Sequence, residues 1–192
     1  MNARLALFCL TSLGFAAEVP SAEWQIKTAL LAAPKAEQAA ATVLGYDQSG
    51  AVVTLRKGTN NLICLASDPK KKDFSVACYH KDLDPFMARG RELAAQGKKP
   101  NEILKIREEE VKSGKLKMPD RGVLNVSVGK PNKETGEVAG LYTRYVVYIP
   151  YATPETTGIP LVPATPGGPW MMDPGTHRAH IMINPPKPAP TP

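Results

Sequence analysis

The chain has 192 residues, of which 43% are hydrophobic, and it carries a formal net charge of +6. This length and apolar content suit one globular domain with a true core, and exclude a disordered or fibrous chain. The charge is only mildly basic, which makes nucleic acid a poor partner. Beyond the N-terminus no stretch is long and apolar enough to cross a bilayer, so we expect no transmembrane segment in the mature chain.

The N-terminus has the layout of a Sec-type signal peptide. Arg4 and the terminal amine supply positive charge, and residues 5–17 form an apolar stretch too short to span a bilayer. Small residues at Gly14 and Ala16 predict cleavage after Ala16, which leaves a single α+β domain over residues 17–184. The alternative is a buried N-terminal helix. A signal peptide predicts a periplasmic or secreted protein.

A helix and two strands are expected first in the mature chain. Residues 21–33 have a helical pattern with Ser21 as the N-cap. Its buried stripe is expected to consist of Trp24, Ile26, Leu30 and Leu31. Residues 42–46 and 51–55 have strand patterns and flank a turn that ends at Gly50, which predicts a hairpin.

The two cysteines outside the signal peptide predict a disulfide. Residues 62–66 and 74–80 both have strand character. Antiparallel pairing with Cys64 opposite Cys78 places the apolar side chains of both strands on one face. An even number of cysteines in an exported chain favours pairing, and the alternative is two buried free thiols. With the two preceding strands, these segments predict a four-stranded N-terminal meander.

Helices and further strands are expected in the second half. Asp84–Pro85 and Pro100–Asn101 each place proline near a helix start, which predicts a helix after each pair. The remaining strand patterns cover residues 122–128, 141–149 and 179–183. We therefore predict an α+β fold: a largely antiparallel sheet with two or three helices packed on one side of it.

Residues 150–176 are expected to be irregular, because they contain seven prolines. Their aromatic and methionine side chains are candidates for lining a ligand pocket or partner groove. These candidates are Tyr151, Trp170, Met171 and Met172. The alternative, which we favour, is that they anchor the loop to the sheet with Trp170 buried. Residues 185–192 form a proline-rich tail that we expect to be disordered.

Several segments resemble a group of uncharacterised exported bacterial proteins. The resemblance lies in TVLGY (42–46), GTNNLIC (58–64), ACYH (77–80) and PGT (174–176) with AHIMI (179–183). It extends over most of the mature chain. It implies a bacterial source and no assigned activity, so it supplies no catalytic residue.

The histidines are the candidate metal ligands. His177 and His180 follow Asp173, and imidazole with carboxylate is a common ligand mix for divalent transition metals. Residues three apart share a face of a helix but lie on opposite faces of a strand, so both rings reach one ion only if the chain turns. His80, at the end of its strand, is a further candidate. The alternative is a loop histidine at 177, a core-edge histidine at 180 and a packed one at 80.

Catalytic motifs are absent from the sequence. It contains no Gly-x-Ser-x-Gly elbow, phosphate-binding glycine loop or Cys-x-x-Cys pair. The lysines at 70–72 and 98–99 are either contacts for an anionic envelope surface or ordinary solvated side chains. We therefore expect a non-enzymatic envelope module, binding or structural, whose partner is an unknown envelope component or small ligand. The alternative is a small metal-dependent enzyme or metal-binding protein that uses His177 and His180.

Overall fold

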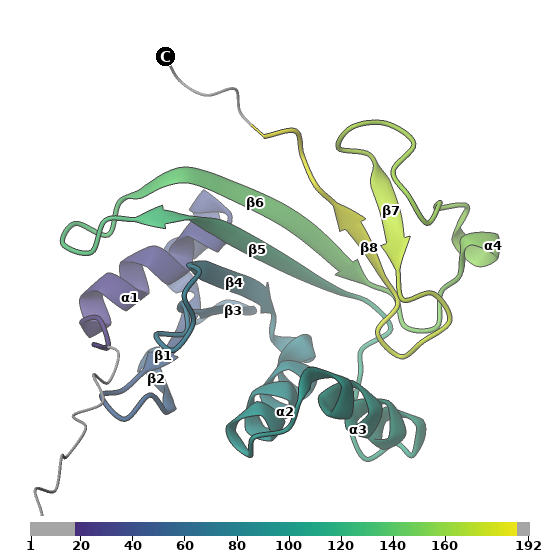
Figure 1. Cartoon of the computed structure of the whole chain (residues 1–192), viewed down its shortest axis with the longest axis horizontal. Coiled ribbons are helices and arrows are strands. Elements are labelled where there is room, and N and C mark those ends of the chain that lie inside the picture. Colours follow the sequence, from purple (N-terminus) through teal and green to yellow (C-terminus); the bar gives the residue numbers. More distant parts are fainter. Residues whose placement is uncertain (1–17, 188–192) are drawn as a thin grey trace, which may run out of the picture.

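The computed structural model describes residues 18–187, which build an eight-stranded sheet with helices on both faces (Figure 1). The α+β class is thus confirmed. The predicted signal peptide (1–16) and the last five residues of the predicted tail lie outside the described residues. No helix within residues 18–187 has the length and apolarity to cross a membrane. The strands are β1 (Thr42–Tyr46), β2 (Val52–Arg56), β3 (Leu62–Leu65), β4 (Ser75–His80), β5 (Gly122–Pro131), β6 (Val138–Tyr148), β7 (Pro169–Met172) and β8 (His180–Ile183).

The sheet is mixed, with the strand order β2-β1-β3-β4-β5-β6-β8-β7. β1 and β3 run parallel, whereas the other neighbouring strands are antiparallel. The predictions of a largely antiparallel sheet and of an N-terminal meander are therefore wrong. Instead of turning back beside β2, the chain passes round the start of β1 and enters β3 on its other side.

Gly58 permits this crossover. Its N–H donates to Thr42 Oγ1 at 3.0 Å, and the N–H groups of Thr59 and Asn60 both donate to the carbonyl oxygen of Ala40. The connection thus lies directly against the chain that enters β1. A Cβ at position 58 would collide with backbone atoms of Ala40 and Thr42, so only glycine fits. In the sequence, Gly58 looks like a turn glycine between two strands. In the fold, it lies where two segments of backbone cross in close contact.

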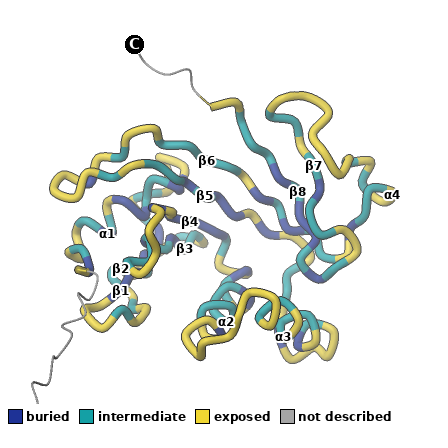
Figure 2. The backbone as a smooth tube through the Cα atoms, in the orientation of Figure 1, coloured by how far each residue is buried: buried dark blue, intermediate teal, exposed yellow. Residues whose placement is uncertain are grey.

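β4 contributes to two hydrophobic cores. Val76 and Cys78 pack into one cluster, and Ala77 and Tyr79 pack into another on the opposite face. This is the period-two alternation of a strand that is covered on both sides. β4 is accordingly one of the most continuously buried strands in Figure 2.

α1 (Ala22–Ala29) and the 3-10 turn η1 (Leu30–Ala32) cover the disulfide face, and the 3-10 segment η2 (Lys35–Ala40) leads into β1. The predicted cap is confirmed, because Ser21 Oγ accepts from Trp24 N at 3.2 Å. The predicted stripe is only partly buried. The buried side chains of α1 are Gln25, Thr28 and Ala29. Gln25 ends β1 by accepting from Tyr46 N at 2.8 Å and donating to Tyr46 O at 3.0 Å.

α2 (Asp84–Ala95) and α3 (Pro100–Lys112) lie on the opposite face, after the 3-10 turn η3 (Lys81–Leu83). The prediction that the helices share one side is therefore wrong, because the sheet buries both faces. The helical segments also outnumber the two or three predicted. Arg89 of α2 and Glu110 of α3 form a two-pronged ion pair, with Nη2–Oε1 at 2.7 Å and Nε–Oε2 at 2.9 Å.

The proline-rich segment 150–176 contains two elements that the sequence did not predict, the short helix α4 (Pro154–Thr157) and strand β7. Pro154 starts the helix, where its missing N–H is not needed. Pro169 starts a strand at the sheet edge, where proline is tolerated. These two prolines thus occupy the first positions of elements, where they are compatible with a helix or an edge strand.

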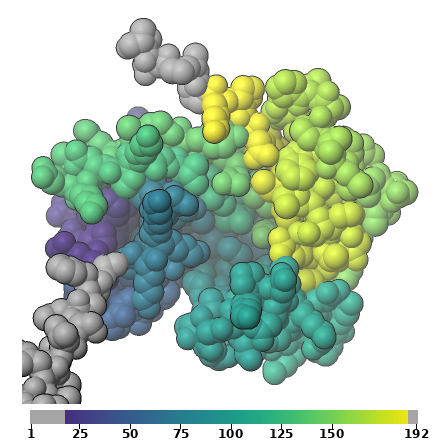
Figure 3. All heavy atoms as spheres, in the orientation of Figure 1, coloured from purple at the N-terminus to yellow at the C-terminus, as the bar shows by residue number. Residues whose placement is uncertain are grey.

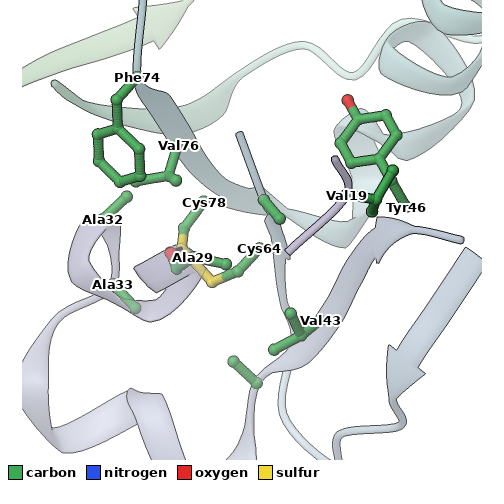
Figure 4. Packing of buried hydrophobic residues seen from close by; sticks show 12 residues of the cluster. Val19, Ala29, Ala32, Ala33, Val43, Tyr46, Cys64, Phe74, Val76 and Cys78 are labelled. Carbon is green, nitrogen blue, oxygen red and sulfur yellow. Dashed lines mark hydrogen bonds between the residues drawn. A yellow bond between two sulfur atoms is a disulfide. The ribbon is translucent and has the colours of Figure 1, made fainter. Parts of the chain in front are cut away.

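The Cys64–Cys78 disulfide is confirmed together with its predicted register, in which Leu62 pairs with His80. Both cysteines are fully buried. Figure 4 shows the bond between β3 and β4, with Ala29 of α1 beside it and Val43 of β1 nearby. The disulfide therefore lies inside the core that joins α1 to the sheet.

Replacing both cysteines by alanine should lower the free energy of unfolding by about 3 kcal/mol, because the unfolded chain is then no longer cross-linked. Urea denaturation followed by circular dichroism measures the change. Reducing the disulfide of the unmodified protein should cause a similar loss. An unchanged urea midpoint in either experiment would contradict the prediction.

Acid should loosen the α2–α3 pair. The hydrogen bonds from Arg89 hold the pKa of the Glu110 carboxyl below its usual range. Such a group stabilises the fold above its unfolded pKa of about 4.3, and this stabilisation is lost as pH falls through the lower folded-state pKa. Glu110→Gln should cost about 1–2 kcal/mol at pH 7 and flatten the loss of stability below about pH 4.3. The exposed neighbour Glu109→Gln is the control, and the prediction fails if both variants behave alike.

Candidate functional site

The chain between β7 and β8 turns so that His177 and His180 reach the same side of the sheet. Thr176 N donates to Asp173 O at 3.3 Å and Ala179 N donates to Thr176 O at 3.1 Å, so turns replace an extended strand here. The two rings are linked by a row of aromatic contacts: His177 packs on Phe86, Phe86 on Tyr148, and Tyr148 on His180.

His180 is held by polar contacts at the start of β8. Its Nδ1 lies 2.7 Å from Arg178 O and 4.0 Å from Asp173 Oδ2. The Asp173 carboxylate in turn pairs with Arg178 Nε at 2.9 Å. Asp173 adopts a left-handed φ of 51°, a conformation that is rare outside glycine. Burial lowers the pKa of His180.

His177 is buried without partners. Only 2% of the residue is exposed, and neither ring nitrogen has a hydrogen-bond partner within residues 18–187. Burial lowers the pKa of this histidine as well, so its ring is neutral at pH 7. Buried polar atoms normally have a hydrogen-bond partner. Two ring nitrogens of one histidine that both lack a partner therefore require an explanation.

Phe86 of α2 is the centre of this arrangement. The Arg107 guanidinium carbon lies 3.9 Å from the Phe86 ring centroid, and the His177 and Tyr148 rings lie at 5.7 Å and 6.0 Å. Arg107 Nη1 also donates to Phe86 O at 3.2 Å. We call Phe86 with Arg107, Tyr148, His177 and His180 the Phe86 cluster. It joins α2 and α3 to the C-terminal strands of the sheet.

The predicted metal ligands come together only in part. His180 and Asp173 are neighbours, with His177 in the same region. His80 ends β4, where alternation places it on the side of Cys78, and its Nδ1 accepts from Asp82 N at 3.3 Å. Within the described residues no three His, Cys, Asp or Glu side chains are grouped to hold a metal ion. Metal binding by these residues stays a prediction.

The four candidate ligand-binding side chains of residues 150–176 lie in three different environments. Met171 is buried with Ala152 and Ala179 in a small core beside α4. Trp170 and Met172 are partly buried against the cluster that contains Tyr148. Tyr151 is exposed and has a φ of 63°. These side chains therefore do not form one shared surface.

An open hollow lies beside α1, and we call it the α1 cleft. It has a volume of about 590 Å³ and is bounded by residues 18–24, the β3–β4 turn and the β5–β6 turn. In Figure 3 these segments are the purple, blue and green regions that meet at the left. The apolar part of its lining contains Trp24 and Phe74, whose rings lie edge-to-face at 6.2 Å. Three lysines, Lys71, Lys72 and Lys133, stand at its rim with the acidic Glu18, Asp68 and Glu134.

The sequence interpretation missed this cleft. It assigned Trp24 and Phe74 to the core, and both do contact the core, but each also faces the hollow. The one available signal was the lysine run at 70–72, for which contact with an anionic surface was one of two interpretations and ordinary solvated side chains the other. No family model matches the chain, and neither a curated protein nor a solved structure matches it.

His177→Phe should raise the free energy of unfolding at pH 7 by about 1 kcal/mol, because burying unpaired polar atoms costs about 1–3 kcal/mol. Phenylalanine keeps an aromatic ring against Phe86. Urea denaturation measures the difference, and His80→Phe, at an exposed capping histidine, should give no gain. A loss of stability in His177→Phe would show that the imidazole nitrogens have partners in solution.

Proposed function

We propose that the chain is an exported, non-enzymatic binding module of the cell envelope. Its ligand, held in the α1 cleft, has an apolar body and an anionic group. The observation that carries this proposal is the Trp24–Phe74 wall with three lysines around one hollow. Mostly apolar walls with a few charged groups are typical of small-ligand sites. A second hollow of about 690 Å³ beside η3 has no aromatic side chain in its lining.

The three lysines of the rim are the contacts that we assign to the anionic group. Within residues 18–187, Lys71, Lys72 and Lys133 form no ion pair with a carboxylate. The acidic residues of the rim balance them locally, but the chain carries a net charge of +6, or +5 once Arg4 is removed with the expected signal peptide. This excess creates a positive long-range potential that raises the local concentration of anions.

The walls of the cleft are held in place before any ligand arrives. Trp24 Nε1 donates to Asn132 O at 3.1 Å, and Lys27 Nζ donates to Thr135 O at 2.7 Å. These bonds tie α1 to the β5–β6 turn. A preformed site loses less side-chain and loop entropy on binding, so more of the contact energy becomes affinity.

Export is the second half of the proposal. The buried Cys64–Cys78 disulfide suits a protein of an oxidising compartment, such as the periplasm or the cell exterior. The expected signal peptide over residues 1–16 accounts for delivery to that compartment.

Anilinonaphthalene sulfonate, an aromatic anion, tests the cleft in the mature protein carrying Trp170→Phe. The chain has two tryptophans, so Trp24 is then the only one. We expect saturable quenching of Trp24 fluorescence, because this indole lines the cleft. Replacing Lys71 and Lys72 by glutamine should weaken binding about fivefold, at about 0.5 kcal/mol for each exposed charge contact.

The matched control replaces Lys98 and Lys99 by glutamine. This double substitution changes the net charge by the same amount, but the two residues lie between α2 and α3 rather than at the α1 cleft. This control should alter the dissociation constant less than the Lys71/Lys72 variant does. Equal weakening by both double variants, or an absence of Trp24 quenching, would rule out the α1 cleft as the site.

A further inference from the structure

The Phe86 cluster contains hydrogen-bond donors that lack acceptors. Arg107 Nε is buried without a partner, and so are both ring nitrogens of His177. The Tyr148 hydroxyl forms no hydrogen bond with another described residue, but it keeps some exposure to solvent and is therefore not orphaned as these nitrogens are. A neutral imidazole offers one N–H, a guanidinium offers only donors, and a tyrosine hydroxyl can donate. Two buried donors without acceptors, one from α3 and one from the turn before β8, thus pack on one phenylalanine ring, and the Tyr148 ring packs on it as well.

The charge around the cluster is also unbalanced. Arg178 is neutralised by Asp173, and Glu108 of α3 is paired with Lys112 at 2.7 Å. Arg107 forms no ion pair with any carboxylate among residues 18–187. Burying a cation without a counter-charge costs free energy. A bound anion would supply the counter-charge that Arg107 lacks.

We propose that the Phe86 cluster is a second binding site, separate from the α1 cleft, for a small oxyanion: a carboxylate or phosphate group. The edge of Arg107 that carries Nε and Nη2 meets the oxyanion with two parallel hydrogen bonds, since Nη1 is occupied by Phe86 O. The His177 N–H and the Tyr148 hydroxyl donate to the remaining oxygens. The ligand provides the acceptors that these donors lack.

The α2–α3 pair closes this site. The buried residues of α2 are Phe86 and Leu93, and that of α3 is Glu110, which pairs with Arg89 of α2. The two helices are thus bound to each other by a strong ion pair, whereas Figure 2 shows their outer surfaces largely exposed. Elements with few buried contacts are the ones that open most easily. The pair moves as one unit away from the sheet and admits the anion.

Thermal unfolding of the mature protein in phosphate, malonate and chloride, at one ionic strength, tests the proposal. Phosphate or malonate should raise Tm by about 3 °C at roughly five times its dissociation constant, relative to chloride. A response to phosphate alone assigns a phosphate ligand, and a response to malonate alone assigns a carboxylate. Equal Tm values in all three salts would overturn the proposal.

Variants locate the effect. Arg107→Gln should abolish the rise, and Arg107→Lys should retain only part of it, because lysine keeps the charge but not the two-pronged geometry. Lys105→Gln, at an exposed position of the same helix, is the matched control and should respond like the unmodified protein. A full rise in Arg107→Gln would overturn the site.

A milder change keeps the test valid if Arg107→Gln does not fold. Tyr148→Phe removes one hydroxyl and should reduce the affinity for the oxyanion several-fold, whereas undiminished affinity would contradict the assignment. Titration of Trp24 fluorescence with anilinonaphthalene sulfonate should be unchanged in both variants. The two proposed sites can therefore fail independently.

Discussion

The alternation of side chains along β4 is the constraint on which the rest of the structure depends. Val76 and Cys78 require cover on one face, and Ala77 and Tyr79 require it on the other. A strand that is apolar on both sides cannot leave either face to water. α1 must therefore lie on one face and the α2–α3 pair on the other. The α1 cleft lies at the edge of the layer that α1 forms, and the Phe86 cluster lies beneath α2 and α3.

Each helical layer contains buried polar groups. Under α1, the Gln25 amide is satisfied at both ends by Pro20 and Tyr46, so it joins the helix to β1. Under α2 and α3, the nitrogens of His177 and Arg107 Nε have no partner in the described residues. A satisfied buried group makes a fold specific, whereas an unsatisfied one reduces stability. An unpartnered atom also lies beside η1, at Asn125 Oδ1, so the proposed oxyanion site rests on the gathering of such nitrogens around Phe86.

Elements that depend on local pattern were predictable from sequence. The pairing of Cys64 with Cys78 followed from two neighbouring strands with period-two alternation, and β1 was predicted with its observed bounds. The N-terminal meander was predicted wrongly, because the close contact that demands glycine at position 58 involves Ala40 and Thr42, which the local pattern does not report. β7 was missed because prolines suggest loops, although Pro169 occupies a strand end at the sheet edge.

The sequence by itself determined the class of fold, most of the helices and strands, and the disulfide, because periodicity, capping and short-range pairing are written in neighbouring residues. Only the tertiary structure decided the place of β1 between β2 and β3, the division of the helices between two faces, and both candidate sites. The contacts of Trp24 with Phe74, and of Phe86 with His177, join segments far apart in the chain. Such contacts depend on strand order, and strand order follows from the packing of the whole sheet rather than from any local pattern.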